Sequence, residues 1–371
     1  MGLSSALHHQ IKQYTQMSSG TMKAVIFKGV GKVAVEDRPI PTIQDPKDII
    51  VKVSMTALCG SELHVYRGHQ KSATDFIMGH EFTGVVHELG DDVKTVKKGD
   101  LVVTPFTVSC GECFYCKRGF TSRCEKSLLF GTPTLDGGQA EYVRIPLADA
   151  SVIKAPEDVD PTVLNLMADI FPTGYFAASR VLKDLPEEER KTSVNVVIGC
   201  GPVGICAIIA AREMVETIYA IDSVPERLAE AKAHGAIPIN LNDNPKDVIL
   251  KATNGRGADN VLEIVGHADA LQLGFDLLRP WGRISSVGVH NENIPFTGNQ
   301  AYGKNLTISF GRCPVRAIFE ESLQVLRRNS KALSTFVDTV MPLSKAVEGY
   351  EQFDQRKVRK VVFYPDTTSA E

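Results

Sequence analysis

The first part of the chain alternates short apolar runs with polar residues and glycines. Runs of strand length are Lys23–Phe27, Ile49–Ser54, Phe82–Glu88 and Asp100–Val103. Gly84, Gly90 and Gly99 stand where turns are needed between or within these runs. This pattern predicts a compact, β-rich barrel in the N-terminal part of the chain.

After about residue 160 the pattern changes to strands that alternate with helices. The expected strands are Val194–Ile198, Thr217–Ile221, Asn260–Val265 and Gly282–Val289, and the expected helices are Val203–Arg212 and Pro225–His234. Near-continuous apolar strands separated by helices are typical of a parallel sheet covered on both faces. We therefore expect an α/β protein with a doubly wound parallel-sheet domain.

The composition narrows the class of protein. The chain has 371 residues, of which 43% are apolar and 23% charged, and its formal net charge is −3. This length suits two soluble domains, and the absence of a basic stripe argues against a nucleic-acid partner. No apolar run reaches the roughly 18 residues of a membrane span.

The first 21 residues have no apolar core of the kind found in secretory signals. They lack acidic residues, a feature shared with transit peptides, but Lys12 is their only lysine or arginine. We expect residues 1–21 to be a disordered tail and the protein to be cytoplasmic.

A glycine-rich segment lies between a predicted strand and a predicted helix. It reads Gly199-Cys-Gly201-Pro202-Val203-Gly204, a G-x-G-x-x-G pattern. In dinucleotide-binding proteins the first glycine permits a tight turn, the second lets the backbone approach a pyrophosphate, and the third allows close packing of helix on strand. The N–H groups at the start of the helix then bind the phosphate charge.

A carboxylate at the end of the next strand supports this interpretation. Asp222 follows Gly199 by 23 residues, where it can accept both ribose hydroxyls of a dinucleotide. It would repel a 2′-phosphate, so NAD is favoured over NADP. Arg227, one turn further, could also contact the adenosine ribose. The alternative is that Asp222 only caps the helix that starts at Pro225.

Four of the eight cysteines lie within 15 residues. Cys110, Cys113, Cys116 and Cys124 form a C-x2-C-x2-C-x7-C array. Four thiolates from one short lobe can complete a tetrahedron around Zn²⁺, which leaves no open position for chemistry and implies a structural role. An iron–sulfur cluster is the alternative on spacing alone.

Further potential ligands are scattered along the chain. They are Cys59, His80, Glu81 and Asp169. Taken singly, each has an ordinary explanation as a buried thiol, a core histidine or a capping carboxylate.

Together these motifs resemble the zinc-containing medium-chain dehydrogenase/reductase family, which includes alcohol, polyol and formaldehyde dehydrogenases. The resemblance runs from about Met22 to the C-terminus. It includes Gly79-His80-Glu81, with Gly84, Gly90, Gly99 and Asp100 at the expected steps, then the cysteine lobe and the glycine-rich segment. It implies a GroES-like catalytic domain over residues 22–170, an inserted Rossmann domain over 171–311, and a return to the catalytic domain over 312–371.

The resemblance also assigns the scattered ligands. It implies that Cys59, His80 and Asp169 bind a catalytic zinc, and that Glu81 is a neighbouring carboxylate that binds the metal or displaces water. Most relatives have a second cysteine where this chain has Asp169. The aspartate variant resembles some bacterial secondary alcohol dehydrogenases and the glutathione-independent formaldehyde dehydrogenases.

Other roles follow from the same resemblance. Ser61 and His64 match a proton relay that runs through the nicotinamide ribose. Gly60 departs from relatives that have a basic residue there, so one phosphate contact is missing or replaced. The remaining matches are Phe106 and Val289 in the substrate pocket, Thr173 and Val203 against the nicotinamide, and Arg359 at the pyrophosphate.

The expected protein is therefore a zinc-dependent alcohol dehydrogenase that transfers a hydride between NAD and a small primary or secondary alcohol or carbonyl compound. We expect two zinc ions per chain and a homodimer or homotetramer. The alternatives are a polyol or glutathione-independent formaldehyde dehydrogenase and, of another class, a zinc-free relative of the quinone-reductase or crystallin type.

Overall fold

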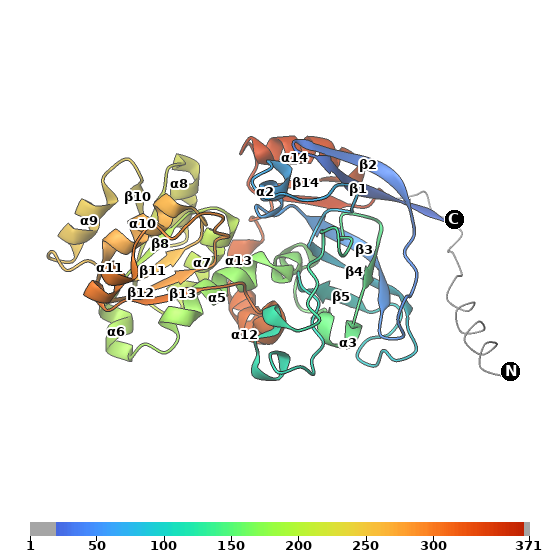
Figure 1. Cartoon of the computed structure of the whole chain (residues 1–371), viewed down its shortest axis with the longest axis horizontal. Helices are drawn as coiled ribbons and strands as arrows, with labels where there is room; N and C mark the ends of the chain where they lie inside the picture. Colours follow the sequence, from blue (N-terminus) through green and yellow to red (C-terminus); the bar gives the residue numbers. More distant parts are fainter. Residues whose placement is uncertain (1–19, 367–371) are drawn as a thin grey trace. The chain divides into compact units, whose positions relative to one another are not determined.

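The computed structural model describes residues 20–366, which form two compact units (Figure 1). The first unit contains the chain up to Asp169, then Pro314–Ala317 and the chain from Ser334 onward. The second contains Ile170–Cys313 and Ile318–Leu333. Residues 318–333, which the sequence analysis placed in the C-terminal return, thus belong to the second unit. The expected tail lies outside the described residues except at its end, where Thr21 already belongs to strand β1.

The first unit is built on antiparallel strands. Seven strands form a sheet in which β14, β15, β3, β4, β5 and β7 follow one another and β6 pairs with β3, while β1 and β2 form a separate hairpin. The strands are β1 (Thr21–Gly29), β2 (Lys32–Pro39), β3 (Ile49–Ala57), β4 (Glu81–Leu89), β5 (Leu101–Thr104), β6 (Tyr142–Ile145), β7 (Ile153–Lys154), β14 (Thr339–Pro342) and β15 (Val361–Tyr364).

Short helices complete this unit. They are α2 (Glu62–Tyr66), η1 (Cys116–Arg118), η2 (Thr121–Arg123), α3 (Ala148–Ser151), α4 (Pro161–Leu164), η3 (Asn165–Ala168), η4 (Leu343–Lys345) and α14 (Ala346–Asp354). One apolar core joins the N-terminal strands to α14 through Phe27, Leu58, Tyr350 and Phe363, each at most 2% exposed. The C-terminal segment therefore contributes to the same core as the start of the chain.

The second unit is a parallel six-stranded sheet in the order β10–β9–β8–β11–β12–β13. Its strands are β8 (Val194–Ile198), β9 (Thr217–Asp222), β10 (Ile237–Asn240), β11 (Ala258–Glu263), β12 (Leu278–Ser286) and β13 (Thr307–Phe310). Its helices are α5 (Ile170–Leu182), α6 (Glu187–Thr192), α7 (Pro202–Arg212), α8 (Pro225–Ala233), α9 (Pro245–Ala252), α10 (Ala268–Leu277), α11 (Gly298–Lys304) and α13 (Ser330–Leu333), while α12 (Val315–Arg328) begins in the first unit and continues in this one.

The burial pattern explains the parallel sheet. Every residue of β8 and of β11 is buried, as expected for strands covered on both faces. The strand β11 ends two residues earlier than predicted, at Glu263, because its carboxylate Oε1 accepts the backbone N–H groups of Val265 and Gly266 and so starts a turn there. The order reverses at β8, so β9 and β11 lie on its two sides, which is the position where open α/β sheets bind ligands.

Within residues 20–366, no helix combines the length and apolar character that crossing a membrane requires.

Candidate metal and dinucleotide sites

Strand pairing places one group of potential ligands at a single edge of the first unit. In the antiparallel pair β3–β4, Ala57 lies opposite Glu81. Cys59 follows β3 by two residues and His80 immediately precedes β4, so both lie at this edge. Asp169 arrives at the end of η3, whose residue Ala168 accepts the backbone N–H of Phe106 at 3.1 Å. Cys59 and Asp169, which are 110 positions apart in the sequence, are thereby brought together.

The ligand atoms of Cys59, His80, Glu81 and Asp169 all lie within 4.8 Å of one another, and all four residues are buried. Asp169 Oδ2 is 3.3 Å from His80 Nε2 and 3.6 Å from Cys59 Sγ. Zinc–ligand bonds of roughly 2.0–2.3 Å in a tetrahedron require ligand atoms about 3.3–3.8 Å apart. The spacing of Cys59, His80 and Asp169 therefore fits a zinc ion.

The electrostatics of this cluster also fit a cation. Burial raises the pKa of the Cys59 thiol, and the Glu81 and Asp169 carboxylates raise it further. A divalent ion among these groups would reverse that effect, because a coordinating thiol is deprotonated. Glu81 differs from the other three: its Oε2 lies 2.6 Å from the Lys360 ammonium, while its buried Oε1 has no hydrogen-bond partner.

Lys360 and Glu62 are two charged residues that the sequence analysis did not select. Lys360 precedes β15 and also donates to the Leu58 carbonyl at 2.9 Å. Glu62 Oε1 lies 3.3 Å from His80 Nδ1, so it can fix the ring with Nε2 toward the cluster. The signals that could have found them are a lysine next to an apolar strand and a carboxylate three residues after Cys59.

Ser61 and Phe106 border the cluster. Ser61 Oγ is 3.2 Å from Cys59 Sγ and 3.3 Å from His80 Nε2. The ring of Phe106 packs edge-on against His80, with 6.2 Å between centroids. His64 belongs to α2 and is partly exposed. Its pKa is lowered mainly by burial and, to a smaller extent, by the nearby His69 and Arg67.

The second potential metal group consists of Cys110, Cys113, Cys116 and Cys124. Their thiol sulfurs lie within 4.8 Å of one another, and Cys113 Sγ is 4.0 Å from Cys124 Sγ. Backbone N–H groups donate to these sulfurs, including Cys110 N to Cys124 Sγ at 3.2 Å and Cys113 N to Cys110 Sγ at 3.3 Å. All eight cysteines of the chain are free of disulfides. The lobe therefore presents four sulfurs in a closed set, as a structural zinc requires.

The glycine-rich segment in the second unit has the expected geometry. Gly199 follows β8 with φ +93°, a conformation that favours glycine. A side chain on Gly204 would come 1.9 Å from the Gly199 carbonyl oxygen, so the third glycine allows α7 to approach the strand. Apart from Gly201 itself and its two chain neighbours, no atom lies within 4 Å of the position where a Cβ of Gly201 would be. That open space, at the N-terminus of an 11-residue helix that starts at Pro202, suits a phosphate.

Asp222 ends β9 beside this turn. Its Oδ2 accepts the Cys200 N–H at 2.8 Å and its Oδ1 accepts the Val224 N–H at 2.9 Å. The second bond is the local contact expected if Asp222 orders the start of α8, whereas the first ties it to the glycine-rich turn. Arg227 lies 3.7 Å from the same carboxylate. Both carboxylate oxygens keep a further lone pair for a ligand.

The other predicted contacts are distributed between the units. Thr173 and Val203 belong to α5 and α7 of the second unit, and Val289, 47% exposed, follows β12. Arg359 belongs to the first unit, where its guanidinium donates to the carbonyls of Phe336 at 3.0 Å and Thr335 at 2.6 Å.

A buried cluster at the ends of β11 and β12 was missed. Glu263 Oε2 accepts the Ser286 hydroxyl at 2.7 Å and lies 3.0 Å from His290 Nε2. Because this carboxylate also binds the turn after β11, it orders the sheet edge on the side of β8 away from Asp222.

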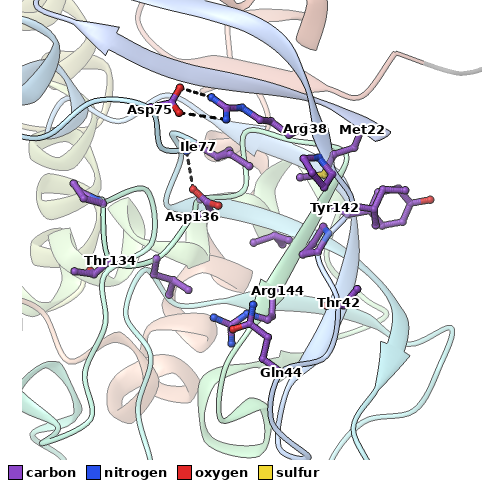
Figure 2. Close-up of a pocket in the computed structure, with 17 residues that line it drawn as sticks. Met22, Arg38, Thr42, Gln44, Asp75, Ile77, Thr134, Asp136, Tyr142 and Arg144 are labelled. Atoms are coloured by element: carbon purple, nitrogen blue, oxygen red, sulfur yellow. Dashed lines mark hydrogen bonds and ion pairs between the residues drawn. The ribbon is translucent and has the colours of Figure 1, made fainter. Parts of the chain in front are cut away.

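A hollow of about 540 Å³ on the first unit is separate from both metal groups (Figure 2). It is lined by β1, the end of β2, the loop around Pro133 and strand β6, and none of the eight predicted metal ligands contributes to it. Arg38 in its wall is already paired with Asp75, and Arg144 with Asp48 at 2.9 Å. The two arginines of the hollow are thus already paired, and Asp136, which also lines it, accepts the Ile77 N–H at 2.8 Å.

Comparisons with known proteins agree with these features. The alcohol dehydrogenase GroES-like domain matches residues 45–157, and the zinc-binding dehydrogenase domain matches residues 202–328. The chain is 56% identical over 354 residues to zinc-type alcohol dehydrogenase B of Aspergillus flavus, which covers 94% of this chain and 83% of the relative. It is 50% identical over 291 residues to a medium chain reductase/dehydrogenase of an Acremonium species, which covers 77% of this chain and all of the relative.

Among solved structures, alcohol dehydrogenase TADH from Thermus sp. ATN1 superposes with a TM-score of 0.86 at 36% identity, over 93% of this chain and all of that one. The predicted fold, a GroES-like domain with a Rossmann-type parallel sheet, is thereby confirmed. The protein is an oxidoreductase, and the chain belongs to the zinc-containing alcohol dehydrogenases of the medium-chain dehydrogenase/reductase family.

Proposed function

We propose that this protein transfers a hydride between NAD and a small primary or secondary alcohol or its carbonyl product, at a zinc ion held by Cys59, His80 and Asp169. The observation that carries the proposal is the buried cluster itself, in which Asp169 Oδ2 lies 3.3 Å and 3.6 Å from the other two ligand atoms. Two anionic ligands and one neutral imidazole balance a divalent cation. When bound, the zinc supplies a Lewis acid that favours the deprotonated alcohol.

The protein's own residues then handle the proton. Ser61 Oγ lies beside Cys59 Sγ and His80 Nε2, where it can accept the hydroxyl proton of an alcohol. His64, on the same short helix and partly exposed, can release a proton to solvent. Because burial lowers its pKa, its imidazole is neutral near pH 7 and is ready to accept a proton.

NAD is the proposed cofactor because Asp222 places a negative charge at the glycine-rich turn. That carboxylate can accept ribose hydroxyls, and it would repel the 2′-phosphate of NADP. Thr173, Val203 and Val289 are proposed for the nicotinamide side of the site, and Arg359 for the pyrophosphate.

A second zinc in the lobe of Cys110, Cys113, Cys116 and Cys124 is proposed to be structural. Four thiolates leave no position for a substrate, so this ion would order the lobe rather than catalyse.

We further propose a homodimer or homotetramer. Strand β13 is an edge strand of the six-stranded sheet, and its last residue, Phe310, is 43% exposed. An exposed edge of this kind can pair with a second copy. Sedimentation equilibrium over a range of protein concentrations tests this, and a monomer at every concentration would contradict it.

Initial rates with a panel of primary, secondary and polyhydric alcohols, each with NAD and with NADP, test the function. The expected result is NADH formation with at least one simple alcohol and a lower kcat/KM with NADP. Protein that contains two zinc equivalents but reduces neither cofactor with any alcohol, and oxidises neither with the matching carbonyl compounds, would overturn the proposal.

A further inference from the structure

A chain of buried side-chain contacts, two hydrogen bonds followed by one close ionic contact, runs from helix α14 to the proposed ligand His80. The Tyr350 hydroxyl donates to Gln139 Oε1 at 2.8 Å, and Gln139 Nε2 donates to Glu62 Oε2 at 3.2 Å. Glu62 Oε1 in turn lies 3.3 Å from His80 Nδ1. Tyr350 and Gln139 are fully buried, and Glu62 and His80 are 6% and 7% exposed. Because water is excluded from these groups, the two hydrogen bonds hold the Glu62 carboxylate in place beside His80.

The donors and acceptors allow one direction along this chain. The Gln139 amide must turn its Nε2 toward the acceptor-only Glu62 carboxylate, which leaves its Oε1 for the Tyr350 hydroxyl. The backbone N–H of Cys59 also donates to Glu62 Oε2 at 3.2 Å. Two donors thus hold Oε2, and the other oxygen faces His80 Nδ1.

The backbone around Gln139 is fixed independently. Its N–H donates to the Met78 carbonyl at 2.9 Å, and its carbonyl accepts the Val25 N–H at 2.8 Å. Gly79, directly before His80, has φ +99°, and a Cβ there would come 2.5 Å from Gln139 Cγ. The absence of a side chain at position 79 therefore lets Gln139 pack against Gly79, directly before His80.

We propose that Gln139 and Tyr350 are positioning residues for His80, which act through Glu62 to hold the imidazole with Nε2 toward the metal. The proposal rests on the proposed catalytic zinc and deepens it, because it extends control of that site to a tyrosine in the hydrophobic core. Burial raises the pKa of Tyr350 well above its usual value, so the hydroxyl stays a donor throughout the working pH range.

Tyr350→Phe tests the proposal because it removes one oxygen from the chain and nothing else. Tyr66→Phe is the matched control: Tyr66 is 8% exposed, its ring packs 5.4 Å from that of Tyr350, and its hydroxyl takes no part in the chain. The measurement is the rate at which the catalytic zinc passes to a chromogenic chelator, together with the visible spectrum of the cobalt-substituted protein.

Loss of a partner of a metal-bound histidine typically weakens metal binding 10–100-fold, so a group two bonds further out should change release about 3–10-fold. We expect faster release and an altered cobalt spectrum in Tyr350→Phe, with values within twofold of wild type in Tyr66→Phe. Equal effects of the two substitutions, or no effect of Tyr350→Phe, would overturn the proposal.

Gln139→Leu provides a second arm. If the chain acts as a unit, Gln139→Leu speeds release by itself, and adding Tyr350→Phe to it has no further effect. If instead the effects of Gln139→Leu and Tyr350→Phe on zinc release were additive, Tyr350 would act only through its packing in the core and not through Gln139. The underlying zinc assignment fails separately: in that case Cys59→Ser would leave the zinc content and the cobalt spectrum of the protein unchanged.

Discussion

The ammonium of Lys360 lies 2.6 Å from Glu81 Oε2, and the two side chains are only 1% and 0% exposed. Burial lowers the pKa of this lysine, but Glu81 and then Cys59 outweigh it, and the net direction is upward. Burial raises the pKa of Glu81, and the Lys360 ammonium opposes that rise. Glu81 is therefore neutralised by a residue of the chain itself. This leaves Cys59 and Asp169 as the anionic groups for a divalent ion.

The first prediction separates Asp169 from Glu81 as the metal ligand. Asp169→Asn should lower zinc occupancy of the catalytic site and reduce kcat strongly, because an uncharged amide is a poorer ligand. Asp169→Cys, which restores a charged ligand, should keep the metal. The measurement is the zinc content of each variant. Cys113→Ala, whose substitution lies in the cysteine lobe, serves as the control. Full occupancy with near-normal turnover in Asp169→Asn would remove it from the ligand set.

The second prediction concerns the cost of separating the buried ion pair. Lys360→Met leaves the Glu81 carboxylate buried without its partner and should lower the free energy of unfolding by about 3–5 kcal/mol. The double variant Lys360→Met/Glu81→Gln should regain much of that loss, since neither charge is then left alone. Denaturant titrations of Lys360→Met, Glu81→Gln, the double variant and the wild type measure this, and simple addition of the two single effects would contradict it.

Both groups of potential metal ligands could be selected from the sequence, the cysteine lobe by its spacing and the other four residues through the family resemblance, and the structure brings each group together. The glycine-rich segment could be selected because its spacing reflects one turn of backbone. Lys360 was not selected, because its role depends on the pairing of β15 with β3, which brings it to Leu58 and to Glu81, the latter 279 residues away. Sequence analysis selected its neighbour Arg359 instead. The two neighbours have different surroundings: Lys360 reaches the buried Glu81 carboxylate, whereas Arg359 donates to the backbone carbonyls of Phe336 and Thr335.

The roles of Gln139 and Tyr350 could not be predicted from the sequence for a similar reason. Neither residue type has strong spacing rules, and the bond between them joins positions 211 residues apart. The ends of strands also depended on side-chain contacts. Strand β11 ends at Glu263, whose carboxylate accepts the N–H groups of Val265 and Gly266.

The third prediction concerns cofactor choice. We expect NAD to be favoured over NADP by roughly 10²-fold in kcat/KM, a few kcal/mol, from repulsion of the 2′-phosphate and lost ribose hydrogen bonds. Asp222→Asn should narrow that gap mainly through a higher KM for NAD, and Arg227, 3.7 Å away, can then face a phosphate without competition. An Asp222→Asn enzyme with an unchanged ratio would mean that Asp222 only orders the glycine-rich turn and α8.

The fourth prediction is a pH dependence on the surface of the first unit. Hydrogen bonds from Arg38 and Lys28 lower the pKa of Asp75 to about 2, from an ordinary value near 3.8. A depressed carboxyl pKa stabilises the fold above the unfolded value, and this contribution is lost as the pH falls from about 3.8 toward 2. Asp75→Asn, which tolerates the local φ of +74°, should therefore be less stable than wild type at pH 5–7 by a small amount. The difference measured by thermal unfolding should shrink below pH 4, whereas a constant difference would exclude the ion pairs as its source.

The last prediction assigns different consequences to the two metal groups. Protein purified without chelator should contain about two zinc equivalents per chain. In the lobe, the four sulfurs form a closed set, and those of Cys110, Cys113 and Cys124 accept backbone N–H groups. Cys113→Ala should therefore remove one zinc and lower thermal stability first. In the buried cluster, Cys59→Ala should remove the other zinc and abolish turnover while the protein stays folded.

Zinc content, melting temperature and kcat measured on both variants distinguish these outcomes. A lobe that binds an iron–sulfur cluster would instead give a coloured protein with one zinc equivalent. If Cys113→Ala abolished turnover at full stability, the lobe would be part of the chemistry and its structural assignment would be wrong. The expected result, in which one site supports stability and the other turnover, follows from coordination alone: a metal that four thiolates enclose cannot bind a substrate, and one with three protein ligands can.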